Sequence, residues 1–424
     1  MEQIISKKYI GTKWACYITN ISMAAVGILS PLLFETFKES YGISNTLLGL
    51  LVVMNFCTQL LIDLIFTFFP SKFNIKKVII AMPLITASGL IIYAVMPLVL
   101  PSFIYLWLSL GTVVFSVSAG LCEVLISPII AALPSDNPDR DMSKLHSVYA
   151  WGLVAVVIIG TLFLKLLQII NAGWYFLPIL FALIPTASFI LFLRSPLPEV
   201  KLGDNGSKDK EKKSGGLLKT GIVLCFLCIF FGGAAEGTMT QWVSSYIEST
   251  LSFPKLIGDI LGMALFAFML AFGRTFYAKF GKKILNIMII GMAGAMVCYI
   301  VAGVVTNTYI GLIACIMTGL FVSMLWPGNI ILIGEKFPTA GVAAYALMAA
   351  GGDLGCSLAP QLMGIVADVV APSGIAENIA TKLNLTAEQV GMRAGLIVSA
   401  LFPIAGLVIA SIMKIYFNKK QNKK

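Results

Sequence analysis

The chain has 424 residues, of which 58% are hydrophobic and only 12% are charged. Soluble proteins carry about 25% charged residues, so this composition excludes a soluble enzyme, a nucleic-acid-binding protein and a disordered protein. The net charge of +10 does not by itself indicate an anionic partner, because the cytoplasmic loops of membrane proteins collect Lys and Arg. The sequence therefore predicts an integral membrane protein.

Twelve apolar segments follow one another along the chain, and most exceed the ~18 residues that indicate a spanning helix. They are continuously apolar, unlike the alternating strands of a β-barrel. Thr386 and Gln389 have the spacing of a capping box that opens the last helix. We therefore predict an all-α membrane protein with 12 transmembrane helices, at residues 13–37, 46–69, 78–98, 102–133, 147–168, 173–193, 219–246, 257–278, 284–305, 308–334, 341–370 and 390–417.

The basic residues gather in alternate loops. With the N-terminus placed in the cytoplasm, 23 of the 30 Lys and Arg residues fall on the cytoplasmic side and five on the outer side. This bias predicts a multi-pass protein of the cell (plasma) membrane with both termini in the cytoplasm. Residues 194–218 are rich in Gly, Ser and Lys, which predicts a cytoplasmic linker between two six-helix bundles at 1–193 and 219–424.

The two predicted bundles resemble each other in sequence. Gly120 in the fourth predicted helix and Gly319 in the tenth are each followed by a proline eight residues later. Residues 72–77 (KFNIKK) and 279–283 (KFGKK) follow corresponding helices in the two halves. In transporters built from such repeats, the substrate site lies near the membrane midplane between the halves, which rock around it. The sequence thus predicts two pseudo-repeated bundles.

Four acidic residues lie within the predicted helices: Asp63, Glu123, Glu236 and Asp353. A charge at this depth is costly and usually marks a functional pathway. Because each acid shares its helix face with other polar residues, we expect a polar interior cavity. Glu123, Glu236 and Asp353 are the candidates for proton coupling, and the alternative for each is a structural carboxylate with a Lys, Arg or backbone partner. Asp63 lies nearer the cytoplasmic end, where a gating role or a structural pair is expected.

Amide and indole side chains on the same helices are candidates for lining the cavity. Indole rings can stack on the apolar face of a sugar while amides and carboxylates bind its hydroxyl groups. The alternative for each Trp is a packing role or a place at the membrane interface. The candidates are Asn55, Gln59, Trp151, Gln241, Trp242, Trp326, Asn329 and Gln361.

Twelve helices in two sets of six, joined by a long central linker, resemble the major facilitator superfamily. The loops after the second and eighth helices are similar to the basic half of that family's signature, whose acidic position is Ser71 in one copy and Ala278 in the other. The resemblance implies a gate in these loops, for which the candidates are Asp63, Lys72, Lys76, Lys77, Arg274, Lys279, Gly281, Lys282 and Lys283.

Four stretches also resemble the fucose permease-like sugar:proton symporters of that superfamily, at residues 120–128, 145–152, 233–237 and 351–368. In those symporters the acid of the fourth helix takes part in proton coupling, which implies this role for Glu123. Two positions depart from their pattern: Ser127 replaces an Asn, and Gly27 replaces an acid of the first helix.

The sequence therefore predicts a secondary active transporter that works by alternating access. We expect proton-coupled uptake of a sugar or similar small polar solute, with sodium as the other possible coupling ion. The same fold also suits proton-driven efflux of drugs or metabolites, and a non-transporting membrane sensor is the alternative of another class. No P-loop, H-E-x-x-H or G-x-S-x-G motif is present, so no enzyme activity is predicted. We expect no cofactor, no metal and no nucleic-acid partner, and a monomer in the lipid bilayer.

Overall fold

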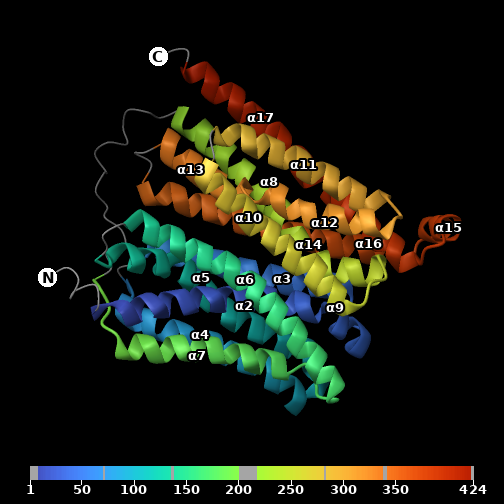
Figure 1. The fold of residues 1–424 in the computed structure, drawn as a ribbon, viewed down its shortest axis with the longest axis horizontal. Helices are drawn as coiled ribbons and strands as arrows, with labels where there is room; N and C mark the ends of the chain where they lie inside the picture. The colour runs from blue at the N-terminus through green and yellow to red at the C-terminus, as the bar shows by residue number, and fades with distance from the viewer. Residues whose placement is uncertain are drawn as a thin grey trace. The chain divides into compact units, whose positions relative to one another are not determined.

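The computed structural model describes residues 8–69, 72–134, 138–199, 217–280, 283–337 and 341–421. Every regular element within these residues is a helix. Twelve helical segments are long and apolar enough to cross a membrane, which confirms the prediction of an all-α protein with 12 spans. Figure 1 shows these helices coloured in chain order.

Six of these segments come from the first half of the chain. The fourth begins with the short helix η2 (Pro101–Phe103). Helix α6 starts before the apolar segment predicted from residue 147, because hydropathy marks the membrane span and not the helix end. The helices are α2 (Ile10–Tyr41), α3 (Asn45–Phe68), α4 (Ile75–Val99), α5 (Ile104–Ala132), α6 (Pro138–Ile169) and α7 (Phe176–Arg194).

The spans of the second half are more often interrupted. Two of them contain π-helical turns, and two consist of a pair of helices separated by a short break. The elements are α8 (Leu217–Ser245), η4 (Tyr246–Thr250), α9 (Lys255–Ile257), η5 (Gly258–Ala264), α10 (Leu265–Phe280), α11 (Ile284–Val304), α12 (Thr308–Val322), α13 (Leu325–Lys336), α14 (Gly341–Val370), α16 (Ala387–Ser399) and α17 (Leu401–Gln421). A further helix, α15 (Gly374–Leu383), lies between two spans and was not predicted.

The chain divides into two compact units. The first unit comprises Met1–Thr36 and Met54–Asp204. The second comprises Asn205–Lys424 together with Phe37–Val53, which is the end of α2 and the beginning of α3. Two helices of the first half of the sequence therefore contribute their joined ends to the second unit.

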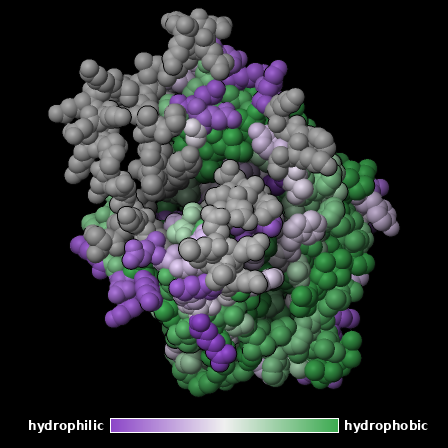
Figure 2. Space-filling view, turned by 60° about the vertical axis from the view of Figure 1, so that its left-hand side comes forward, coloured by the Kyte–Doolittle hydropathy of each residue, from purple (hydrophilic) through white to green (hydrophobic). Residues whose placement is uncertain are grey.

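The core of the first unit is built around α5. Leu121, Leu125 and Ile129 of this helix are buried in one cluster with Met82 of α4 and Phe192 of α7. Apolar side chains also remain exposed on many helices, and Figure 2 shows hydrophobic residues over wide continuous areas of the visible surface. Such areas are unusual on soluble proteins and suit contact with lipid.

Buried polar groups in the second unit find partners on neighbouring helices. The hydroxyl of Tyr299 donates to the carbonyl of Ala235 at 2.7 Å, and Arg393 Nη1 donates to the carbonyl of Val305 at 2.7 Å. Val305 follows the last residue of α11, so the guanidinium satisfies a carbonyl group at the end of that helix. These bonds matter because lipid offers polar groups no alternative partner.

Candidate functional site

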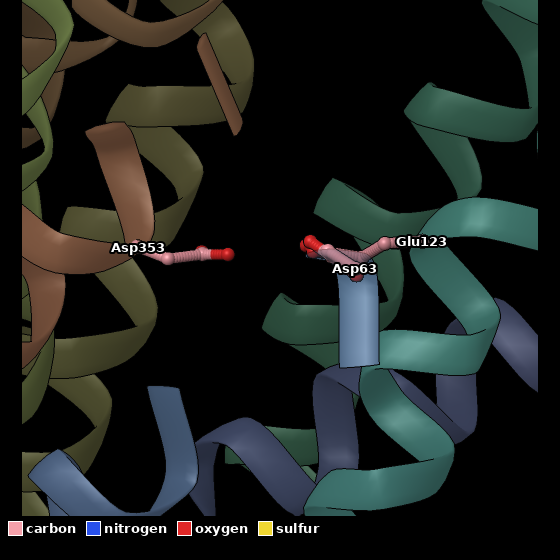
Figure 3. Close-up of side chains that lie close together, drawn as sticks. All are labelled: Asp63, Glu123 and Asp353. Carbon is pink, nitrogen blue, oxygen red and sulfur yellow. The ribbon is translucent and has the colours of Figure 1, made fainter. Parts of the chain in front are cut away.

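Two acidic side chains meet in the first unit, Asp63 of α3 and Glu123 of α5. One carboxylate oxygen of each lies within 4.8 Å of the other. Figure 3 shows the two side chains lying next to each other. Asp63 is buried and Glu123 is partly exposed. The sequence predicted a gating role or a structural pair for Asp63 and proton coupling for Glu123. It did not predict that the two acids lie together.

Gly120 allows the two helices to approach closely at this point. A Cβ atom on Gly120 would lie 2.9 Å from the carbonyl oxygen of Gln59, which is too close for any side chain. Gln59 stands one turn before Asp63, and Gly120 stands almost one turn before Glu123. The close contact of the two backbones therefore brings the carboxyl groups together.

The proximity of the two carboxyl groups favours a shared proton. An ionised carboxylate can only accept hydrogen bonds, so the two groups can bond to each other only when they hold at least one proton between them. Without it, two like charges at this distance would repel by about 1–3 kcal/mol, for effective dielectric constants between those of water and a protein surface. The arrangement is therefore more favourable with a proton on the pair than with both groups ionised.

A buried amide network lies on the same faces of α3 and α5. The Oδ1 of Asn55 accepts hydrogen bonds from Gln59 Nε2 at 2.9 Å and from Ser116 Oγ at 2.6 Å. All three side chains are buried. These polar residues share the helix faces of Asp63 and Glu123. Their side chains bond to one another next to the acidic pair.

A second pair of charges lies in the second unit. Arg274 of α10 donates to Glu236 of α8 at 2.8 Å and, through Nε, to the carbonyl of Ser323 at 3.1 Å. Ser323 lies in the break between α12 and α13, where the carbonyl groups of the ending helix are available. Glu236 thus has an Arg partner, which agrees with the alternative that it is a structural carboxylate. Arg274 forms this pair within the second unit.

Asp353, the third candidate for proton coupling, comes from α14 of the second unit and is also drawn in Figure 3. Its side chain is buried. The neighbouring Gly352 packs against the ring of Trp326. The position of Asp353 within its unit is thus fixed by the packing of α14 against α13.

The candidates for the cavity lining fall into two groups. Trp242 and Asn329 have no exposed surface, and they donate to the carbonyl groups of Pro360 at 2.9 Å and Leu325 at 2.7 Å. Such side chains hold helices in place. Gln241 is also buried. The side chains that keep some exposed surface are Trp151, Trp326 and Gln361.

The lysine candidates for a gate are exposed where their side chains are described. The ammonium group of Lys72 lies 4.9 Å from the centre of the Phe69 ring. Lys76 and Lys77 are exposed in the first turn of α4, and Lys283 is exposed with a left-handed backbone (φ 56°) before α11. The side chain of Lys279 and the residues Gly281 and Lys282 lie outside the described part of the chain.

Other buried acids were missed by the sequence. Asp259, in η5, lies fully buried beside Lys255 at 3.5 Å and accepts a hydrogen bond from Ser244. Glu35, in α2, is also buried. More than the four predicted acids therefore lie within the spans. The signal for Asp259 was its place inside a predicted span, four residues after a lysine.

An unpredicted contact joins α3 to α14 within the second unit. The carboxylate of Asp368 accepts hydrogen bonds from Asn45 and Thr46, at the start of α3. Next to it, Gly364 allows a close approach, since a Cβ there would lie 2.5 Å from the carbonyl oxygen of Asn45. We call these four residues the α3–α14 contact. No local pattern could reveal it, because its partners are more than 300 residues apart in sequence.

Comparison with known proteins identifies the family. The family model described as the Major Facilitator Superfamily matches residues 15–360. The chain belongs to the major facilitator superfamily. It is accordingly a secondary transporter in a membrane and not an enzyme, as the sequence predicted. No curated protein matches the chain.

Solved structures of other members share this fold along almost the whole chain. A bacterial homologue of the human lysosomal transporter Spinster, inward-facing and occupied, has a TM-score of 0.72 and 14% identity, covering 97% of this chain and 98% of that one. A D-xylose–proton symporter has a TM-score of 0.75 and 14% identity, covering 93% and 97%. The fucose:proton symporter of E. coli has a TM-score of 0.60 and 12% identity, covering 96% and 99%. At these identities the likeness is one of fold.

Proposed function

We propose that this member of the superfamily couples a proton to the uptake of a sugar or a similar small polar solute. The observation that carries the proposal is the proximity of Asp63 and Glu123, whose carboxylate oxygens lie within 4.8 Å of each other. Acidic residues inside a membrane domain are retained where they serve a pathway, and two carboxyl groups in contact form a site that binds one proton.

The pair links proton binding to helix position. With a proton, the two carboxyl groups attract each other and hold α3 against α5. After the proton leaves, the repulsion of about 1–3 kcal/mol favours their separation. Conformations of a transporter that differ by a few kcal/mol respond to a change of this size. Proton binding from the outside and release into the cytoplasm would then drive the conformational cycle.

Glu236 and Asp353 have other roles in this proposal. Arg274 gives Glu236 a fixed counter-charge, which favours a structural role in the second unit. Asp353 stays a candidate for a second coupling group, because it is a buried acid on a spanning helix.

The proposed solute is polar and small. In the second unit, Trp326 and Gln361 offer a partly exposed indole and an amide, which is the chemistry that binds a sugar ring and its hydroxyl groups. Two neighbours in fold are named as symporters of D-xylose and of fucose with protons. Both observations support a sugar as the first solute to test.

The test is flux into liposomes that contain the purified protein. We expect an inward proton gradient to drive accumulation of at least one sugar from a panel of pentoses, hexoses and deoxysugars. The variant Glu123→Gln should lose this accumulation and retain solute exchange, because its amide can still donate a hydrogen bond to Asp63. Glu377→Gln, an exposed change on α15, is the matched control. Uphill accumulation by Glu123→Gln would overturn the proposed role of Glu123.

Two further measurements test the direction of transport and the coupling ion. Expression of the transporter should raise the cellular content of the solute, whereas a lower content would favour efflux. A sodium gradient in place of the proton gradient should have no effect. Binding of a solute without any flux would favour the sensor alternative.

A further inference from the structure

Helix α15 lies outside the spans, in the connection between α14 and α16. It begins four residues after α14 ends, and α16 begins four residues after α15 ends. Ser373 caps its start by accepting a hydrogen bond from the Ala376 N–H, and Asn384 ends it in the left-handed conformation. Figure 1 shows it beyond the end of α16. The helix is therefore well defined and held close to the ends of two spans.

Three faces of α15 have different surroundings. Ala376 and Ala380 are buried against a small cluster formed with Val370, Leu385 and Val390. Next to this face, an apolar stripe is exposed, with 71% of Ile375, 38% of Ile379 and 49% of Leu383 accessible. The stripe residues recur every four positions and so lie on one side of the helix. The remaining side is polar and consists of Glu377, Asn378, Thr381 and Lys382.

The apolar stripe follows an exposed apolar row on α14. This row runs along the second half of the span at helical spacing and consists of Leu358, Leu362, Ile365 and Val369, all exposed. Val369 is 66% exposed in the last turn of α14, and Ile375 opens α15 six residues later. Only the five residues 370–374 separate the end of this row from the start of the stripe along the chain.

We propose that α15 is an interfacial helix, with Ile375, Ile379 and Leu383 inserted among the lipids of the outer leaflet. A helix with one apolar side and one polar side lies in the plane of the membrane surface. Lys382 borders the stripe, so its chain can extend along lipid while its ammonium group reaches the headgroup phosphates.

The size of the stripe argues against a second copy of the chain as its occupant. A helix of ten residues is about 15 Å long, and stable protein interfaces bury about 800 Å² on each partner. Three side chains provide only part of such an area. Lipid needs no minimum area, because every apolar group that leaves water contributes.

The experiment places a fluorescent label on either side of α15. Cys57 is the exposed cysteine in the described part of the chain, so Cys57→Ser serves as the background. In it, Ile379→Cys and the matched control Thr381→Cys carry the same environment-sensitive label, in nanodiscs of phosphatidylcholine and phosphatidylglycerol with one chain each. Nitroxide lipids labelled near the headgroup should quench the label at 379 several-fold more than the label at 381. Aqueous iodide should give the reverse order.

Two outcomes would overturn the proposal. Equal iodide quenching at 379 and 381 would place the stripe in water and overturn the proposal. Protection of 379 that appears in crowded liposomes and is absent in single-chain nanodiscs would assign the stripe to a second copy. If Ile379→Cys fails to fold, Ile375→Cys tests the same stripe at its most exposed position.

Discussion

Asp368 of α14 caps the first turn of α3 through Thr46, whose N–H and hydroxyl donate to the same carboxylate oxygen at 2.6 and 2.7 Å. The first N–H groups of a helix have no partner within it, and an acidic group is the most favourable one. Here the partner comes from a helix more than 300 residues away. The start of α3 is therefore tied to α14 in the second unit, whereas Asp63, further along α3, belongs to the first.

Loss of this cap should lower stability. Asp368→Asn halves the acceptor capacity at the α3–α14 contact and removes its charge, which should cost about 1–3 kcal/mol. Thermal unfolding in detergent measures the effect as a lower Tm. The control is Glu388→Gln, which breaks the ion pair of an exposed carboxylate with Lys38 and should cost about 0–1 kcal/mol. Equal losses in both variants would contradict the cap.

Asp63 and Glu123 should act as one unit. Asp63→Asn and Glu123→Gln are each expected to abolish proton-driven accumulation, because either change removes the shared proton. The double variant should be no worse than either single variant, since groups that work together are not additive. Proton-driven accumulation of parental size in one of the single variants would instead indicate that the two groups act independently.

The contact at Gly120 should be sensitive to a single methyl group. Gly120→Ala places a Cβ 2.9 Å from the carbonyl oxygen of Gln59, so α3 and α5 must separate. Overpacking of this kind costs about 1–3 kcal/mol, and we expect proton coupling to weaken as well. In the control, Gly27→Ala, the new Cβ has no atom within 4 Å. Parental Tm and parental coupled flux in both variants would show that the contact at Gly120 does not hold the pair together.

The Glu236–Arg274 pair should show a strong energetic coupling. Glu236→Gln and Arg274→Gln each leave one charge without its partner and should lower stability by about 1–3 kcal/mol. The double variant should recover most of the loss, because it leaves no isolated charge. A double-mutant cycle from thermal or denaturant unfolding measures this, and a coupling near zero would show that the pair is incidental.

Much of the fold follows from hydropathy alone, because each spanning helix must be apolar over about 20 residues. The capping box at Thr386 and Gln389 also forms as predicted, with both reciprocal hydrogen bonds present. Helix α15 was missed, since its ten residues mix apolar and polar types and contain no apolar run.

The candidate site was less predictable. Glu123 stands out in sequence as a charge in an apolar helix, but its pairing with Asp63 depends on the rotation and close approach of α3 and α5. Those follow from packing at Gly120 and not from any local pattern. The Arg274 partner of Glu236 likewise comes from another helix.

The most direct test of the central claim is the proton movement that accompanies transport. When solute is added outside weakly buffered liposomes that contain the transporter, its entry with a proton should raise the external pH. We predict this rise for the parent chain and for Glu377→Gln, and none for Asp63→Asn or Glu123→Gln. A solute-dependent rise of parental size in both acidic-pair variants would contradict the assignment of the coupled proton to Asp63 and Glu123.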